Sequence, residues 1–123
     1  MNDINNKDNV VLNKSFDFAL RIIELYKILK SNNEFVISKQ LLRSGTSIGA
    51  NIEEATAAQT KKDFVTKMAN ASKEAREARY WLRLLNKSNL IVFDYRNYLN
   101  EIDELIRIIT AIVKTAQSNL SKH

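Results

Sequence analysis

The sequence has no cysteine, no proline and only two glycines among its 123 residues. Without cysteine it can form no disulfide, no thiolate metal site and no thiol nucleophile, which suits a reducing cytosol. Without proline, and with so little glycine, it has few residues for tight turns or β-bulges. We therefore expect an all-α protein.

Histidine is nearly absent as well, because the only one is His123, the last residue. The chain thus lacks the usual general base, nucleophile and metal-ligand sets, including the Glu-x-x-His pairs of di-iron bundles. The stretch "GTSIG" lacks the lysine of a phosphate-binding loop. We expect no enzymatic activity, no metal and no cofactor.

Long hydrophobic runs are also missing. The longest purely apolar run covers residues 90–93, whereas a membrane span needs about 20 residues. The opening "MNDINNKDN" has no hydrophobic signal core. We expect a cytoplasmic protein with no membrane contact.

What the chain does contain is apolar residues at helical spacing. They predict four helices, at about residues 12–30, 34–59, 61–86 and 94–118. Short loops between helices favour antiparallel neighbours, so the expected fold is an up-down antiparallel four-helix bundle. The expected domain covers residues 10–118, between a frayed tail, 1–9, and a C-terminal tail, 119–123.

Capping residues mark three of the expected helix starts. We predict Asn33 and Asp94 as N-caps, because a short polar side chain can accept from the open amides of the next turn. "TKKD", residues 60–63, resembles a capping box.

The first helix is apolar over more than half of its circumference. Its two adjacent stripes are Leu12, Phe16, Ala19, Leu20, Ile23 and Tyr26, and Phe18, Ile22, Leu25 and Leu29. A single bundle cannot bury so wide an arc completely.

Both glycines lie in the second helix, Gly45 in line with the large apolar residues and Gly49 beside them. Glycine inside a helix costs about 1 kcal/mol relative to alanine. We expect the two glycines to allow another helix to pack closely against this one, assisted by the small side chains of Ser44 and Ser47.

The third helix carries the whole charge excess, since residues 61–93 hold eight basic residues against three acidic ones. At 100° per residue, seven cations fall within an arc of about 120°, opposite the apolar face. They are Lys61, Lys62, Lys73, Arg76, Arg79, Arg83 and Lys87, and Tyr80 shares their arc.

The C-terminal part of this arc has no acidic residue three or four positions away along the helix. Such pairs usually stabilise a helix by a few tenths of a kcal/mol. The arc therefore requires anions from elsewhere, unless it is simply a solvated basic face. These anions are either phosphates or carboxylates of a neighbouring helix or subunit, for example Glu53 and Glu54, or Glu101, Asp103 and Glu104.

At this point the combined residues resemble a known family. "SKQLLRSGTSIGANIEEATAAQTKKDFVTKMANASKEAREARYWLRLL", residues 38–85, is similar to the four helix bundle proteins first found encoded by intervening sequences in bacterial 23S ribosomal RNA genes. The segment "SFDFALRIIELYKIL" before it and the apolar fourth helix after it also fit.

The resemblance implies an up-down bundle that assembles into a ring-like homopentamer, with no enzymatic activity. A relative, the accessory variability determinant of diversity-generating retroelements, has a basic pentamer surface associated with nucleic acid and a reverse transcriptase. In such a ring, Gly49 would admit a helix of another protomer, and the surplus apolar arc of the first helix would be covered. The signature residues carried over are Arg43, Ser44, Ser47, Ile48, Asn51, Ile52, Glu53, Asp63, Phe64, Lys73, Glu74, Trp81 and Leu82.

Two functions remain open from the sequence. The first is nucleic-acid binding, with structured RNA favoured, through phosphate contacts and a stacking tyrosine. Its candidate residues are Lys62, Lys73, Arg76, Arg79, Tyr80, Arg83 and Lys87, with Lys39 and Arg43 as additions. The second is an oligomeric scaffold or adaptor whose basic stripe contacts an acidic protein partner or the adjacent subunit.

Overall fold

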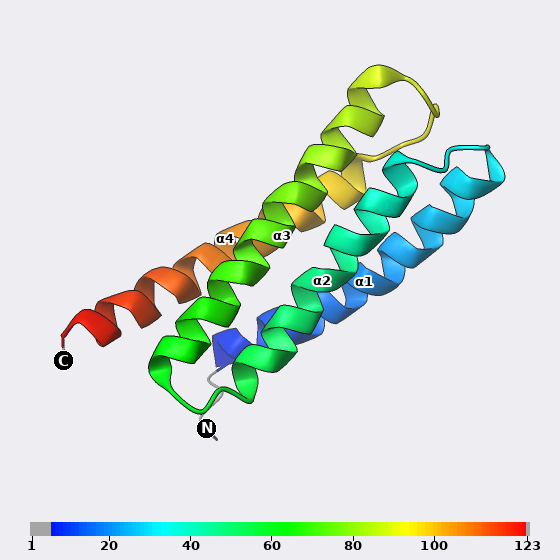
Figure 1. Cartoon of the computed structure of the whole chain (residues 1–123). Helices are drawn as coiled ribbons and strands as arrows, with labels where there is room; N and C mark the ends of the chain where they lie inside the picture. Colours follow the sequence, from blue (N-terminus) through cyan, green and yellow to red (C-terminus); the bar gives the residue numbers. More distant parts are fainter. Residues whose placement is uncertain (1–5, 123) are drawn as a thin grey trace.

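A computed structural model describes residues 6–122 and contains four α-helices and no strand in that range (Figure 1). The expected all-α, four-helix fold is confirmed. The helices are α1 (Asn6–Ser31), α2 (Ile37–Thr56), α3 (Lys61–Ser88) and α4 (Arg96–Ser121).

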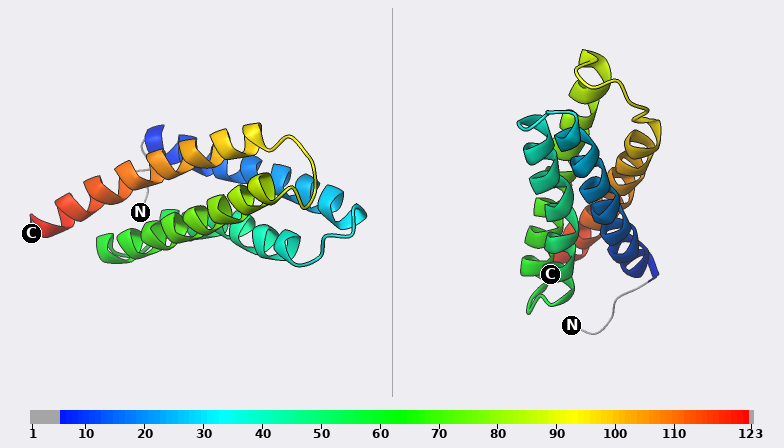
Figure 2. Two further views of the ribbon diagram at one scale, coloured as in Figure 1. Left: turned by 90° about the horizontal axis from the view of Figure 1, so that it is seen from above. Right: turned by 90° about the vertical axis from the view of Figure 1, so that its right-hand side faces the viewer.

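Each helix packs on its neighbours in chain order, and α4 closes back onto α1. The α2–α3 pair has the most extensive contact and the α1–α4 pair the least. Figure 2 shows the difference, because α2 and α3 run side by side whereas α1 and α4 cross. The bundle therefore has four sides, each formed by a pair of adjacent helices: α1 and α2, α2 and α3, α3 and α4, and α4 and α1.

The buried side of α3 is rich in small residues. Ala71, Ala75 and Ala78 are fully buried there, so little side-chain volume separates α3 from the core. The full buried set of α3 agrees with the face expected from the spacing: Phe64, Met68, Ala71, Ala75, Ala78, Leu82 and Leu85.

Only one of the two apolar stripes of α1 lies in the core. Phe18, Ile22, Leu25 and Leu29 are at most 1% exposed. In the other stripe Phe16 is 62% exposed, Leu20 50% and Ile23 36%. The chain itself therefore leaves much of the first stripe uncovered.

The helix ends differ from the expected ones at both termini. α1 already begins at Asn6, so the frayed tail expected at residues 1–9 is wrong from residue 6 onward, and residues 1–5 lie outside the described range. The early start places Val11, which is fully buried, well inside the helix. α4 continues to Ser121, beyond the expected end at residue 118.

The predicted N-cap at Asn33 is wrong. Asn33 has φ 66°, in the left-handed region that asparagine tolerates, and it ends α1 instead of starting α2. The following amide, of Glu34, donates to the Leu29 carbonyl at 2.9 Å, as in a Schellman motif. The Asn33 side chain is therefore not the cap of the next helix.

The buried Glu34 carboxylate caps α2 in its place. Its oxygens accept from the backbone amides of Val36 and Ile37 at 3.1 Å and from that of Ser38 at 2.6 Å. Three open amides of the first turn are thus satisfied by one side chain, and the negative charge suits the positive end of the helix.

The other two caps are close to expectation. Thr60 Oγ1 accepts from the Asp63 amide at 3.0 Å at the start of α3. Asp94 Oδ1 accepts from the Arg96 amide at 3.1 Å, two positions later in the chain, where α4 begins.

Both glycines of α2 face α1 of the same chain. A Cβ at Gly45 would lie 3.0 Å from Cγ1 and Cγ2 of Ile22, so a side chain there would collide with the core. A Cβ at Gly49 would lie 3.4 Å from Ser15 Oγ and 3.5 Å from the Ser15 carbonyl oxygen. Gly49 is thus approached by α1 of the same chain, and its contact with a helix of another protomer stays a prediction.

Candidate functional site

The expected basic arc of α3 lies on the outer side of the helix, toward α4. Six of its seven cations are exposed, and Arg79 is half-buried. The acidic residues of α3 lie on the opposite flank, toward α2. Tyr80 is 52% exposed on the basic side, with its ring edge-on to Trp81 at 5.1 Å between centroids.

One cation of the arc is matched by an acid of the neighbouring helix. Arg79 Nη1 lies 3.5 Å from Asp103 Oδ1 on α4. Arg76 Nη2 lies 3.5 Å from Thr110 Oγ1, also on α4. Asp103 is one of the carboxylates that the sequence offered as partners from a neighbouring helix, and in the structure it lies beside Arg79.

The remaining cations of the arc form no ion pair with the side chains of residues 9–122. These are Lys61, Lys62, Lys73, Arg76, Arg83 and Lys87. The surface is therefore rich in exposed positive charge that the described fold does not neutralise.

Two further cations, which the sequence analysis did not select, extend this surface onto α4. Arg107 and Lys114 follow Asp103 and Thr110 at intervals of four residues, so all four share one side of α4. Arg107 and Lys114 are both exposed. The spacing 103, 107, 110, 114 could have revealed them, but only once this side of α4 was known to lie against α3.

We call the combined set the cationic surface. It consists of Lys62, Lys73, Arg76, Arg83 and Lys87 from α3 and of Arg107 and Lys114 from α4.

The two additional candidates from α2 do not join this surface. Lys39 is exposed near the start of α2, which does not contact α4. Arg43 faces the acidic flank of α3, where Nη1 lies 3.3 Å from Glu74 Oε1 and Nη2 is hydrogen-bonded to Glu77. The charge of Arg43 is therefore already matched within the chain.

Arg43, Glu74, Glu77 and Trp81 form one polar network between α2 and α3. Trp81 Nε1 donates to Glu77 Oε2 at 3.0 Å. The hydrogen bond from Arg43, followed by that from Trp81, lowers the pKa of Glu77, and the same Glu77 contact raises the pKa of Arg43. These are ionised groups that hold two helices together.

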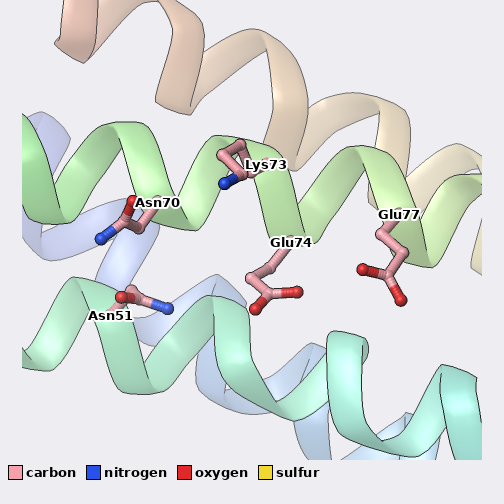
Figure 3. A pocket seen from close by; sticks show the side chains of 5 residues that line it. All are labelled: Asn51, Asn70, Lys73, Glu74 and Glu77. Atoms are coloured by element: carbon pink, nitrogen blue, oxygen red, sulfur yellow. The ribbon is translucent and has the colours of Figure 1, made fainter.

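Beside this network lies a polar hollow of about 330 Å³, lined by Asn51, Asn70, Lys73, Glu74 and Glu77 (Figure 3). Lys73 therefore borders both the hollow and the cationic surface. No group of three or more metal-ligating side chains occurs in the part of the chain that the structure describes.

The small residues named as packing candidates are partly explained. Ser44 is fully buried and its hydroxyl donates to the Gln40 carbonyl at 3.0 Å. The Ser47 hydroxyl donates to the Arg43 carbonyl at 2.6 Å. Both hydroxyls thus donate to backbone carbonyls within α2.

Among the described residues, no helix is long and apolar enough to cross a membrane.

Comparison with known proteins agrees with the resemblance noted in the sequence. A crystal structure of a protein of unknown function from the S23 ribosomal protein family of Bacteroides thetaiotaomicron is 50% identical, with a TM-score of 0.84. The similarity covers 88% of this chain and 98% of that one. A search of curated proteins finds no match. Residues 7–111 match the family described as 23S rRNA-intervening sequence protein, and this chain belongs to that family.

Proposed function

We propose that the protein is a non-catalytic RNA-binding protein that contacts phosphates through the cationic surface. The observation that carries this proposal is the row of exposed cations on α3 and α4 without acidic partners in the described chain. From Arg76 to Lys87 the α3 row alone spans about 17 Å at 1.5 Å per residue. Guanidinium groups suit phosphate because they can donate two parallel hydrogen bonds.

Structured RNA is the favoured ligand, and recognition is expected to follow backbone shape instead of base sequence. The cationic surface lies on two adjacent helices and not in a narrow cleft, so it can approach the phosphates and 2′-hydroxyls of a stem. Tyr80 provides one exposed ring for stacking on an unpaired base. We place this activity in the cytoplasm, where cellular RNA is available.

Self-association is part of the proposal, with a homopentamer as the expected assembly. Its support in this chain is the uncovered stripe of α1, since large exposed apolar patches are typical of interaction sites. A pentamer of the 14.2 kDa chain would have a mass of about 71 kDa. Repetition of the cationic surface would raise the avidity for a polyanion.

The test is the affinity for a structured RNA as a function of salt. With about four phosphates contacted, the slope of log affinity against log salt is expected to be about −3 for a single-stranded segment and about −4 for a stem. The variant R76A/R83A/R107A should reduce the magnitude of this slope by about 2. Its affinity at 0.1 M salt should be about 100-fold weaker than that of the wild type.

A charge-matched control removes three exposed cations elsewhere, in K27A/R96A/K122A. If binding follows net charge alone, both triple variants will lose the same affinity. Equal losses, or an unchanged affinity of R76A/R83A/R107A, would contradict the assignment of the cationic surface.

The scaffold or adaptor function remains the second candidate. It is favoured by the Arg79–Asp103 pair, which shows that a cation of the arc accepts a protein carboxylate. Polyglutamate is a suitable probe for such a partner. Binding of polyglutamate with no measurable affinity for RNA would support the adaptor and reject the RNA proposal.

A further inference from the structure

Most of the exposed large apolar residues of the described chain form two groups at separate places; Val10, Tyr80 and Leu120 lie outside both. The first, which we call the α1 face, contains Phe16, Leu20 and Ile23 of α1. The second, which we call the loop end, contains Phe35 and Val36 of the α1–α2 loop and Leu90 and Val92 of the α3–α4 loop. Both loops lie at the same end of the bundle (Figure 1).

The α1 face is a shallow apolar depression. A hollow of about 330 Å³ lies between α1 and α2, and Leu12, Ala19, Gly49 and Ala50 line it together with the three exposed residues. Gly49 and Ala50 have little or no side chain, so the hollow is shallow and open on the α2 side. The face is therefore shaped to receive a protruding apolar group.

The loop end protrudes and is held in place by buried anchors. In the first loop, the Glu34 carboxylate fixes the amides of Val36 and Ile37, so Phe35 and Val36 are presented outward at 54% and 73% exposure. A loop whose backbone is fixed in this way loses little further entropy when its apolar side chains are covered.

The second loop is anchored similarly. Tyr95 is 2% exposed, and its hydroxyl donates to the Ile91 carbonyl at 2.8 Å. Val92, next to that carbonyl, is 87% exposed. Burial raises the pKa of Tyr95, and Glu34 adds to the increase, which shows that the two anchors lie near each other.

The charges beside the two groups are opposite. Asp17 adjoins Phe16, Glu53 lines the hollow, and neither forms an ion pair with the side chains of residues 9–122. The loop end is flanked by the exposed Lys30 and Lys39, also without an ion pair in that range. Two α1 faces placed together would oppose like charges and leave the loop ends uncovered.

We infer that a second copy of the chain inserts its loop end into the α1 face. This inference rests on the self-association proposed above and names its two contact surfaces. One contact covers both apolar groups and pairs acidic with basic flanks. Because the two surfaces differ, the contact is heterologous, and repeated copies form a closed ring when the rotation between them closes.

Two exposed substitutions test the inference. L20E introduces a charge on the α1 face, and V92E introduces one at the loop end; both side chains are at least half exposed, so the fold should survive. Each variant alone is expected to be monomeric by light scattering. L120E, which changes an exposed leucine outside both groups, is the control and should keep the wild-type mass.

Mixing the two variants gives the decisive measurement. L20E keeps an intact loop end and V92E an intact α1 face, so an equimolar mixture should form a heterodimer of about 28 kDa and nothing larger. The mixture is measured well above the concentration at which the wild type assembles, because a single contact lacks the avidity of a ring. Circular dichroism confirms that each variant is helical.

The outcomes separate this inference from the proposals on which it depends. If either variant keeps the wild-type mass, or if the mixture of two monomeric variants stays monomeric, the pairing of these surfaces is wrong. If the wild type is itself monomeric, the self-association proposal fails and the inference with it. RNA affinity is measured independently and does not decide this question.

Discussion

The two glycines of α2 allow a matched pair of substitutions, G45A and G49A. Both add one methyl group to the same helix, and neither glycine has a positive φ. The gain in helix propensity, about 1 kcal/mol, is therefore the same in both variants. The difference between their free energies of unfolding isolates what the new methyl group meets.

At position 45 the methyl group would lie 3.0 Å from two carbons of Ile22, which is fully buried. Overpacking of this kind costs about 1–3 kcal/mol. We expect a net destabilisation of G45A by about 1 kcal/mol. At position 49 the nearest atom is at 3.4 Å, an ordinary contact, so G49A should be more stable than the wild type by about 0.5–1 kcal/mol.

The measurement is urea unfolding followed by circular dichroism at one protein concentration, in the L20E background so that self-association does not contribute. I22A/G45A supplies a second check, because the added methyl group partly fills the space left by Ile22. The double variant should be more stable than the sum of the two single changes predicts, by about 0.5–3 kcal/mol. Equal stabilities of G45A and G49A would refute the reasoning.

Three further predictions concern the Glu34 cap of α2, the polar network that contains Glu77, and the buried Ala75. E34A should destabilise the protein by about 2 kcal/mol in thermal or urea unfolding because three α2 amides lose their acceptor, whereas E34Q should lose less. The folded-state pKa of Glu77 is lowered from 4.5, so its stabilisation is complete above that value and is lost as the pH falls through the folded pKa. Acid unfolding of E77Q should therefore depend less on pH than that of the wild type. A75L should destabilise by about 1–3 kcal/mol, measured by urea unfolding, because Ala75 is fully buried and a larger side chain would overpack the core.

Helical spacing was sufficient to predict the elements and most of the core. It identified the buried side of α3 correctly because alanine, leucine and methionine recur there without interruption. On α1 the same method gave two stripes and could not choose between them, since the choice depends on where α2 and α4 lie. The stripe with Phe18 and Ile22 is buried, and the one with Phe16 and Leu20 is not.

The points that the sequence did not predict have a local cause at Asn33 and a long-range cause at the basic arc. Asparagine is a common N-cap residue, but Asn33 adopts a positive φ and ends α1. The longer side chain of Glu34 caps α2 instead. Asp103 is 24 positions from its partner Arg79, so no spacing rule within a helix reveals the pair. The extension of the basic arc to α4 was missed for the same reason.

The order of the helices around the bundle gives its four sides unlike chemistry. Hydrocarbon is exposed between α1 and α2, a network of ionised groups joins α2 to α3, and cations lie over α3 and α4, while Arg21–Glu101 and Lys14–Glu104 pairs join α4 to α1. A neighbour that covers the apolar side between α1 and α2 therefore also fixes the direction in which the cationic surface faces. Copies arranged by a common rotation about one axis would all carry their positive charge at the same height along that axis.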